Sequence, residues 1–455
     1  MSISSELLNK YNVAGPRYTS YPTVPFWEHT PTEGQWARSL GIALTAANGS
    51  NVGAALYIHI PFCRRLCTFC GCNNRITRKP GVAEPYVKTL LKEYELYRTK
   101  LGIDRLPISE IHLGGGTPTY LTPEELNVLI TGILDNAELL DDAELSIEAD
   151  PRVTSVEHLS TLRDLGFTRL SLGIQDFDPR VQKAVNRTQS VEMVKTLTKQ
   201  ARDLGFVSIN FDLIYGLPLQ TLDSVRNTIL SVNEMRPDRI SFYSYAHVPW
   251  IKPAHRGFTE DDLPNGDEKR ALYELGRNLL EDAGYREIGM DHFALESDSL
   301  WRAVQGKTLH RNFMGYISRR VTPLLGLGVS AIGDSWNMFA QNEKQLERYV
   351  ERVNEGELPI ERGHILTGED KQLRGHILNL MTRLETNWSD EQKTPFLDSL
   401  SDRLKEPLND QLLKLDNNSC SINENGLPFI RNICMAFDHR LANKQPVTKI
   451  FSQTI

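Results

Sequence analysis

Short β-rich runs alternate with helical segments from residue 54 onward, and this alternation limits the possible folds of the 455-residue chain more than any other feature. Two neighbouring parallel strands need a long crossover connection, which is usually a helix, so repeated βα units indicate a parallel sheet. The pattern predicts six strands, at residues 54–60, 109–113, 144–148, 168–172, 207–213 and 239–244.

Helices are predicted between these strands, for example at residues 86–101 and 123–133. The second has Thr122 at the N-cap position, Pro123 in the first turn and Glu125 three residues after the cap, as in a capping box. Six βα units do not close as the eight units of a full TIM barrel do. We therefore predict an α/β fold, a partial (β/α)6 TIM-like barrel that is open on one side.

Four of the six cysteines lie in the segment from Cys63 to Cys72, directly after the first predicted strand. Thiolates at such short spacing suit a soft metal centre, because each sulfur can reach a common point. Structural zinc usually takes two separated pairs of ligands, and no second pair is visible near Cys420 or Cys434. Zinc remains an alternative to an iron–sulfur cluster.

A [4Fe–4S] cluster has four irons, so the three ligands Cys63, Cys67 and Cys70 leave one iron free for another ligand. This C-x3-C-x2-C spacing resembles the radical S-adenosylmethionine (SAM) superfamily, in which the free iron chelates SAM. With the added Gly71-Cys72 the motif resembles the oxygen-independent coproporphyrinogen III oxidases (coproporphyrinogen dehydrogenases, HemN type). For Cys72 the resemblance favours a place near a second SAM molecule over the role of a fourth cluster ligand.

Polar groups follow the predicted strands at one end of the sheet. The glycines 114–116 follow the second strand, and Glu148 ends the third. Gln175 lies just past the fourth strand, and Asp212 closes the fifth. Taken singly these are more often turns, caps or solvated groups, and the glycines match neither a Walker A loop nor a dinucleotide fingerprint. Their convergence favours a site, because parallel α/β folds bind ligands at the carboxyl ends of the strands.

The sequences around these positions resemble those of the same family, and the resemblance implies two SAM molecules per chain. SAM offers a ribose diol, an ammonium and a sulfonium, so carboxylates and amides accept its hydrogen bonds and offset its positive charge. The SAM-binding residues implied by the resemblance are Tyr57, Phe69, Gly115, Gly116, Thr117, Glu148, Gln175, Arg187, Asp212, Ala246 and Ile332.

The two ends of the chain differ from the repeated units. Prolines and glycine between Gly15 and Pro22 forbid a regular helix and predict an extended arm, which resembles the arm near the family's active-site opening. After residue 365 the pattern changes, and Thr367 is predicted to cap a helix. We predict an N-terminal arm at 1–50, a radical SAM catalytic domain at 51–365 and a smaller, mainly helical C-terminal domain at 366–455.

Candidates for substrate binding are basic. Arg17 in the arm and the pair His310-Arg311 are expected to receive propionates, because a guanidinium is well shaped for carboxylates. A buried structural histidine beside a surface arginine remains the alternative for the pair.

Composition excludes several classes of function. A formal net charge of −7 without a basic stripe argues against nucleic acid as the main partner. No apolar run approaches the ~20 residues of a membrane-spanning helix, and the start of the chain lacks the layout of a signal peptide. We expect a cytoplasmic monomer, since a reducing compartment keeps clustered thiols available.

The resemblance implies an oxidoreductase of haem (porphyrin) biosynthesis. The implied reaction is oxidative decarboxylation of two propionates of coproporphyrinogen III to vinyl groups, giving protoporphyrinogen IX without oxygen. An electron donor such as a flavodoxin- or ferredoxin-like protein is the implied partner. The alternatives are a related radical SAM haem chaperone or haem-cleaving methyltransferase, and a non-enzymatic iron–sulfur or haem-binding protein.

Overall fold

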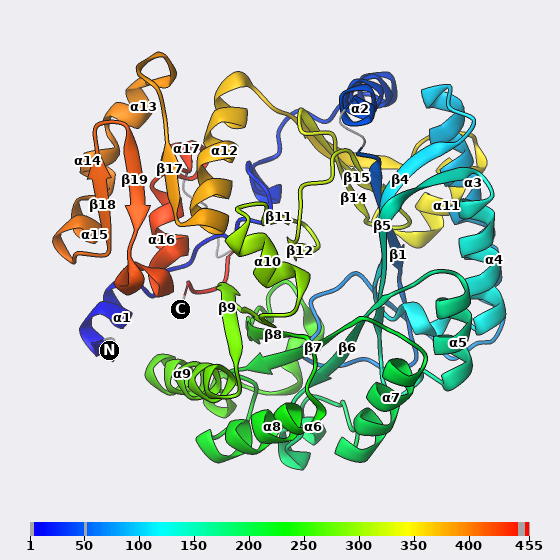
Figure 1. Ribbon diagram of the computed structural model, residues 1–455, viewed down its shortest axis with the longest axis horizontal. Coiled ribbons are helices and arrows are strands. Elements are labelled where there is room, and N and C mark those ends of the chain that lie inside the picture. The colour runs from blue at the N-terminus through cyan, green and yellow to red at the C-terminus, as the bar shows by residue number, and fades with distance from the viewer. Residues whose placement is uncertain (1–3, 50–51, 445–450, 455) are drawn as a thin grey trace.

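The computed structural model describes residues 4–49, 52–444 and 451–454. Within these residues one twelve-stranded sheet forms the centre of the molecule (Figure 1). Its strands lie in the order β16 (Ile360–Ile365), β15 (Met338–Asn342), β14 (Ile332–Asp334), β13 (Leu324–Leu327), β1 (Ala54–Ile60), β4 (Leu106–Gly115), β5 (Ala137–Ala149), β6 (Arg169–Gln175), β7 (Ser208–Tyr215), β8 (Arg239–Ser244), β10 (His292–Leu295) and β9 (Tyr285–Gly289).

Among the described residues, seven neighbouring strands from β13 to β8 run parallel. All six predicted strands are present, and β1 and β8 have the predicted bounds. The seventh, β13, was not predicted, because four residues are too few to show a periodicity. Antiparallel strands extend both edges, and the predicted partial barrel is confirmed.

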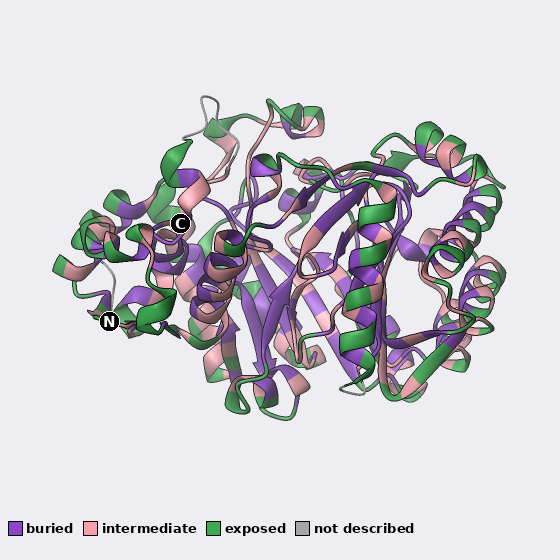
Figure 2. Cartoon of the chain, turned by 90° about the horizontal axis from the view of Figure 1, so that it is seen from above, coloured by how far each residue is buried: buried purple, intermediate pink, exposed green. Residues whose placement is uncertain are grey.

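Helices connect the parallel strands and cover the outer side of the arc (Figure 1). Thr122 and Glu125 form the predicted capping box, with backbone-to-side-chain hydrogen bonds of 2.9 and 3.2 Å. Apolar residues of the strands and of the inward helix faces form one large buried cluster, whereas the outer helix faces are exposed (Figure 2). The covering helices are α3 (Ala83–Leu101), α4 (Pro123–Leu134), α5 (Val156–Asp164), α6 (Pro179–Ala184), α7 (Val191–Asp203), α8 (Leu222–Met235), α9 (Gly266–Asp282) and α11 (Leu346–Asn354).

The N-terminal segment packs against both the barrel and the C-terminal part of the chain. Residues between Gly15 and Pro22 are non-helical, as predicted, but α1 (Ser5–Tyr11) and α2 (Glu33–Asn48) flank them. Helix α2 buries Trp36 in the barrel core, whereas Tyr18 packs in the cluster of the C-terminal part. The predicted domain boundaries at residues 50 and 365 therefore remain a prediction. The predicted N-terminal arm and C-terminal domain each include terminal residues that lie outside the described part, and residues 50–51 at the first boundary also lie outside it.

The C-terminal part begins with α12 (Gly368–Arg383), which Thr367 caps as predicted. A three-stranded sheet was not predicted, because its strands have only three or four residues: β17 (Glu385–Asn387), β19 (Ser419–Ile422) and β18 (Leu413–Asp416). The remaining helices are α13 (Pro395–Asp398), α14 (Leu400–Arg403), α15 (Lys405–Asn409), α16 (Ile430–Met435) and α17 (His439–Asn443). None of the helices in the described residues is long and apolar enough to cross a membrane.

Candidate active site

The cysteine loop follows β1 and is held in place by backbone hydrogen bonds. The short strand β2 (Phe62–Cys63) pairs in parallel with β3 (Arg75–Ile76), and the Thr77 amide donates to the Cys63 carbonyl at 2.9 Å. Further along, the Thr68 amide donates to the Val185 carbonyl after α6, at 3.1 Å. These bonds fix the positions of the cysteines relative to the sheet.

A cavity of about 820 Å³ lies at the carboxyl ends of the parallel strands and reaches into the barrel. The structure thus brings most of the predicted site residues together, as the position of polar groups after the strands indicated. The predicted residues that line it are Cys63, Cys67, Phe69, Cys70, Gly115, Gly116, Thr117, Glu148, Gln175, Arg187 and Asp212, and Cys72 lines it too.

Nitrogen donors lie beside the sulfurs of Cys67 and Cys70. The guanidinium of Arg152 donates to Cys67 Sγ at 3.5 Å, and that of Arg187 donates to the same sulfur at 3.6 Å. The Asn74 amide donates to Cys70 Sγ at 3.4 Å. Such donors stabilise a thiolate, which is the form that binds a metal.

The donor set fits an iron–sulfur cluster. In the described residues no three His, Cys, Asp or Glu side chains surround one point as ligands of a single metal ion would. A [4Fe–4S] cluster does not need that convergence, because each of its thiolate ligands bonds a different iron. Three thiols on one loop, facing one cavity beside N–H donors, are the features that such a cluster requires.

The end of β4 touches the cysteine loop through glycines. Gly115 has φ of +120°, and a Cβ there would lie 2.8 Å from the His59 ring. A Cβ at Gly116 would lie 2.6 Å from the Pro61 carbonyl oxygen and 3.0 Å from Cys63 Sγ. The glycine run is therefore needed for close approach of two strand ends.

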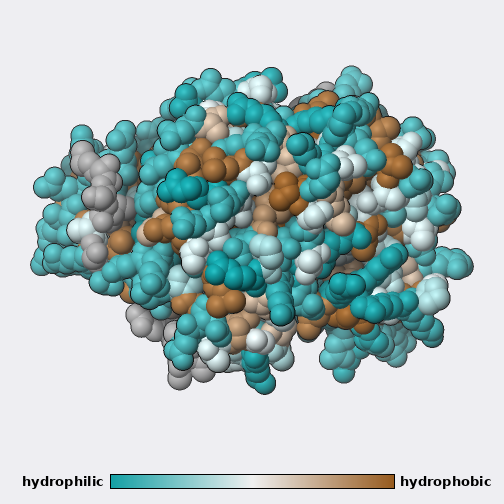
Figure 3. Space-filling view, turned by 90° about the horizontal axis from the view of Figure 1, so that it is seen from below, coloured by the Kyte–Doolittle hydropathy of each residue, from teal (hydrophilic) through white to brown (hydrophobic). Residues whose placement is uncertain are grey.

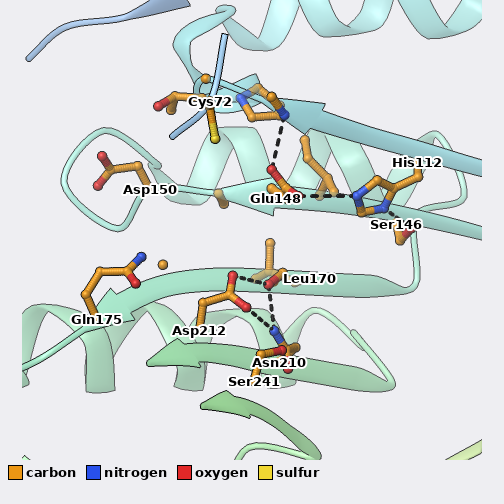
Figure 4. A pocket seen from close by; sticks show the side chains of 18 of the residues that line it. Cys72, His112, Ser146, Glu148, Asp150, Leu170, Gln175, Asn210, Asp212 and Ser241 are labelled. Carbon is orange, nitrogen blue, oxygen red and sulfur yellow. Dashed lines mark hydrogen bonds and ion pairs between the residues drawn. The ribbon is translucent and has the colours of Figure 1, made fainter. Parts of the chain in front are cut away.

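Glu148 occupies the centre of the cavity wall, at the end of β5 (Figure 4). It accepts a hydrogen bond from the Gly115 amide at 3.1 Å and lies 3.5 Å from His112 Nε2. The other ring nitrogen of His112 lies 2.7 Å from Ser146 Oγ. A short chain of side chains thus orients the carboxylate toward the cavity.

Asp212 on β7 is another carboxylate of the cavity (Figure 4). It accepts hydrogen bonds from Ser171 and Asn210, both at 2.9 Å. Burial, and then the negative charge of Glu148, raise the pKa of Asp212 to about 6. Among the described residues neither Glu148 nor Asp212 pairs with an arginine or lysine, so these two carboxylates favour a positively charged ligand.

The basic side of the cavity lies next to the cysteines. Arg187 is 8 % exposed and donates to the Gly173 carbonyl at 2.6 Å, but its Nε has no partner among the described residues. Gln175 lies nearby in left-handed backbone, with φ of +68°, which is uncommon for a side chain larger than glycine and typical of ligand sites. The unpaired Arg187 N–H and the acidic pair together suit a zwitterion such as SAM, which carries a carboxylate and a sulfonium.

Three predicted SAM ligands do not line the cavity. Tyr57 lies on β1, where its hydroxyl is 3.0 Å from His59 Nδ1 and its ring stacks on His112. Ala246 lies in the segment after β8, and Ile332 packs in a separate apolar cluster with Trp27.

The structure brings two of the three substrate candidates together, since Arg311 Nη2 donates to the Arg17 carbonyl at 3.3 Å. Arg17 forms an ion pair with Asp291 at 2.8 Å. His310 and Arg311 are neighbours on β11 (His310–Asn312), and neighbours on a strand point to opposite sides. Burial, and then Arg374, lower the pKa of His310 to about 3, which fits the alternative of a buried neutral histidine.

Several polar residues of the cavity were not predicted from the sequence. His112, Ser146 and Asn210 lie two residues before Gly114, Glu148 and Asp212, respectively, so the period-two alternation of a strand would have indicated them. Asp150 and Arg152 follow β5 without such a signal. Arg152 binds Asp150 with its Nε at 2.9 Å and thereby approaches Cys67.

Comparisons with known proteins identify the family of this chain. Residues 57–232 match the radical SAM superfamily. The oxygen-independent coproporphyrinogen III oxidase of Escherichia coli K12 is 40% identical over 99% of this chain and 98% of its own, and that of Helicobacter pylori J99 is 38% identical over the whole of both chains. The chain belongs to the oxygen-independent coproporphyrinogen III oxidases of the radical SAM superfamily. The family resemblance of the cysteine motif is therefore confirmed.

A solved structure of this family has the same fold. Coproporphyrinogen III oxidase (HemN) from Escherichia coli, described as a radical SAM enzyme, superposes with a TM-score of 0.87, covering 96% of this chain and 99% of that one at 39% identity. Membership in the family confirms that the chain is an enzyme and that its cofactors are a [4Fe–4S] cluster and SAM. These relatives are oxidases, not the haem chaperones or methyltransferases considered as alternatives.

We predict that Gly116→Ala displaces the cysteine loop. The added methyl group would overlap the Pro61 carbonyl and press on Cys63 Sγ, so the free energy of unfolding should fall by about 1–3 kcal/mol. The protein should also retain less iron after anaerobic reconstitution. Thermal unfolding and iron analysis measure both effects.

Gly71→Ala in the same loop is the matched control, because nothing lies within 4 Å of a Cβ at that position. Equal stability and iron content in the two variants would contradict the role given to the close contact at Gly116.

Proposed function

We propose that this chain catalyses the oxygen-independent oxidative decarboxylation of two propionates of coproporphyrinogen III, giving protoporphyrinogen IX. The observation that carries the proposal is a single cavity in which the cysteine loop meets Glu148, Asp212 and Arg187, in a chain that matches oxidases of this name over its full length. An unactivated propionate C–H bond offers no proton that a protein base can remove, so the cofactors supply the difficult step.

In this proposal Cys63, Cys67 and Cys70 hold the cluster. When bound, the cluster and SAM supply 5′-deoxyadenosyl radical chemistry, which can abstract a hydrogen atom from a propionate. Glu148 and Asp212 bind the positive groups of SAM, and Arg187 and Gln175 bind its carboxylate and polar edges. Binding of two SAM molecules, and the roles of Tyr57, Ala246 and Ile332, rest on the family resemblance alone.

Buried cations near the cavity suit the substrate. Arg311 is 5 % exposed and stacks on Tyr316, which lines the cavity, at 4.5 Å. Its Nε and Nη1 have no partner among the described residues. A buried guanidinium with free N–H groups is costly unless an anion binds it, and propionate is such an anion.

Other charges strengthen this cationic region. Burial, and then Arg17 and Arg431, lower the pKa of Lys269 to about 8. The carboxylate of Asp291 is the acidic group that acts on both Lys269 and Arg431. Positive charge therefore exceeds negative charge beside the cavity wall, which favours a substrate with several carboxylates.

The proposed electron donor and cellular setting follow from the chemistry of the cluster. Reduction of the cluster requires a one-electron donor, for which we propose a flavodoxin- or ferredoxin-like protein. All six cysteines are unpaired thiols, which supports a reducing, cytoplasmic setting. We also propose that the protein acts as a monomer.

The direct test is an anaerobic assay. Reconstituted protein with SAM, dithionite and coproporphyrinogen III should release 5′-deoxyadenosine, carbon dioxide and protoporphyrinogen IX, which liquid chromatography and mass spectrometry detect. A protein that carries the cluster but forms neither 5′-deoxyadenosine nor protoporphyrinogen would refute the function.

We predict that Cys63→Ala, Cys67→Ala and Cys70→Ala each abolish cluster assembly, because three ligands are the minimum for this kind of site. Cys72→Ala is the control in the same loop and should keep its cluster. Iron and sulfide analysis with electron paramagnetic resonance of the reduced protein measures the outcome. Loss of the cluster in Cys72→Ala would show that Cys72 is a ligand.

We predict that Arg311→Met raises the KM for coproporphyrinogen III by about tenfold, the effect of losing one charge-assisted hydrogen bond. Arg302→Met removes an exposed arginine of α10 (Ser299–Gln305) and should leave the KM unchanged. Steady-state kinetics and thermal unfolding of both variants distinguish binding from stability. An unchanged KM in a folded Arg311→Met protein would exclude this guanidinium from substrate binding.

A further inference from the structure

A second hollow lies on the outer side of the cysteine loop. Its volume is about 430 Å³, and its wall includes Arg64, Arg65, Leu66, Ile76 and Arg78, which we call the loop patch. Arg64, Arg65 and Leu66 are the residues between Cys63 and Cys67 in the sequence. The patch is therefore the outer surface of the same loop that carries the proposed cluster ligands.

The charge of the loop patch is not neutralised. Arg64, Arg65 and Arg78 are exposed, and none of them forms an ion pair with any residue in the described ranges. The arginine next to the patch, Arg75, differs, since it pairs with Glu347 at 3.0 Å. Three free cations thus gather on a chain whose formal net charge is −7.

Apolar side chains lie among these cations. Leu66 is 37% exposed and Ile76 is 41% exposed. Single exposed apolar residues are ordinary, and the face in Figure 3 shows hydrophobic residues in small groups among hydrophilic ones. Arginines around an apolar centre are more informative, because protein–protein interfaces are enriched in arginine and bury an apolar core inside a polar rim.

The wall of the hollow is preformed. The side-chain amide of Asn186 donates to the Leu66 carbonyl at 2.6 Å, and Asn186 itself has φ of +53°. Across the hollow, Arg78 Nε donates to the Arg64 carbonyl at 3.3 Å. A surface held in this way loses little conformational freedom when a partner binds.

We propose that the loop patch docks a small acidic electron-carrier protein of the flavodoxin type. The proposal rests on the proposed function, because it requires the cluster on the cysteine loop. In the step, the carrier is oxidised by one electron and the cluster is reduced by one electron, and no bond forms or breaks. Electron transfer slows steeply with distance, and a carrier seated here would contact the loop whose Cys63, Cys67 and Cys70 would hold the cluster.

Electrostatics explain why a patch is needed. Two proteins of negative net charge repel each other at long range, so a local positive surface is required to orient an acidic carrier. Docking should therefore weaken as salt screens the charges. Arg64, Arg65 and Arg78 also line the central cavity, so substrate binding is the competing explanation for these three residues. Leu66 and Ile76 line the outer hollow but not the central cavity.

The test compares two reductants. We expect Arg64→Glu/Arg65→Glu to raise the KM for reduced flavodoxin by about tenfold or more, with a smaller effect at high salt. Leu66→Asp/Ile76→Asp should weaken flavodoxin-driven 5′-deoxyadenosine formation as well, while dithionite-driven formation and iron content stay unchanged. Titration calorimetry with oxidised flavodoxin should show the same loss of binding without turnover.

Arg38→Glu/Arg226→Glu is the matched control, because it reverses two exposed arginines on α2 and α8 that form no ion pair in the described residues. Unchanged flavodoxin binding in both loop-patch variants, or a higher KM for coproporphyrinogen III with unchanged flavodoxin kinetics, would overturn the docking site. If the unaltered protein cleaves no SAM even with dithionite, the proposed function fails, and the docking proposal fails with it.

Discussion

The close contact between the ends of β1 and β4 determines how the site is assembled. At positions 115 and 116 the backbone of β4 passes His59 and Pro61 at distances that leave no room for a Cβ. The cysteine loop begins at the same point of β1, and the Gly115 amide is bonded to Glu148. One backbone contact therefore sets the distance between the proposed cluster ligands and the first carboxylate of the cavity.

The charged groups of the cavity differ in their partners. Glu148 and Asp212, on β5 and β7, have no arginine or lysine partner among the described residues, whereas Arg152 and Arg187 face Cys67 and pair with Asp150. A zwitterionic ligand between the two groups would satisfy both, because its cationic part meets Glu148 and Asp212 while its carboxylate meets Arg187. Burial, and then the negative charge of Glu148, explain the raised pKa of Asp212.

The structure brings most of the predicted cofactor-binding residues to one cavity, and there is a physical reason why the sequence indicated them. Strand and cofactor signals are local: the cysteines share one loop, and Glu148 and Asp212 directly end predicted strands. Strands of three or four residues, such as β13 and β19, carry too few side chains for a periodicity to show. His112 was missed although alternation from Gly114 indicated it, because a histidine inside a strand resembles an ordinary core residue.

The residues that we propose for the substrate are distant in the chain, and of these the sequence indicated Arg17 and Arg311 but not Lys269 or Arg431. The cations near Asp291 come from the N-terminal segment, α9, β11 and α16, as Arg17, Lys269, Arg311 and Arg431. Arg431 also donates to the carbonyls of Gly15 and Pro16, so the segment that carries Arg17 is held by the C-terminal part. A motif can encode a cofactor loop, but the cationic region that we propose for the substrate is formed by packing between both ends of the chain and the barrel.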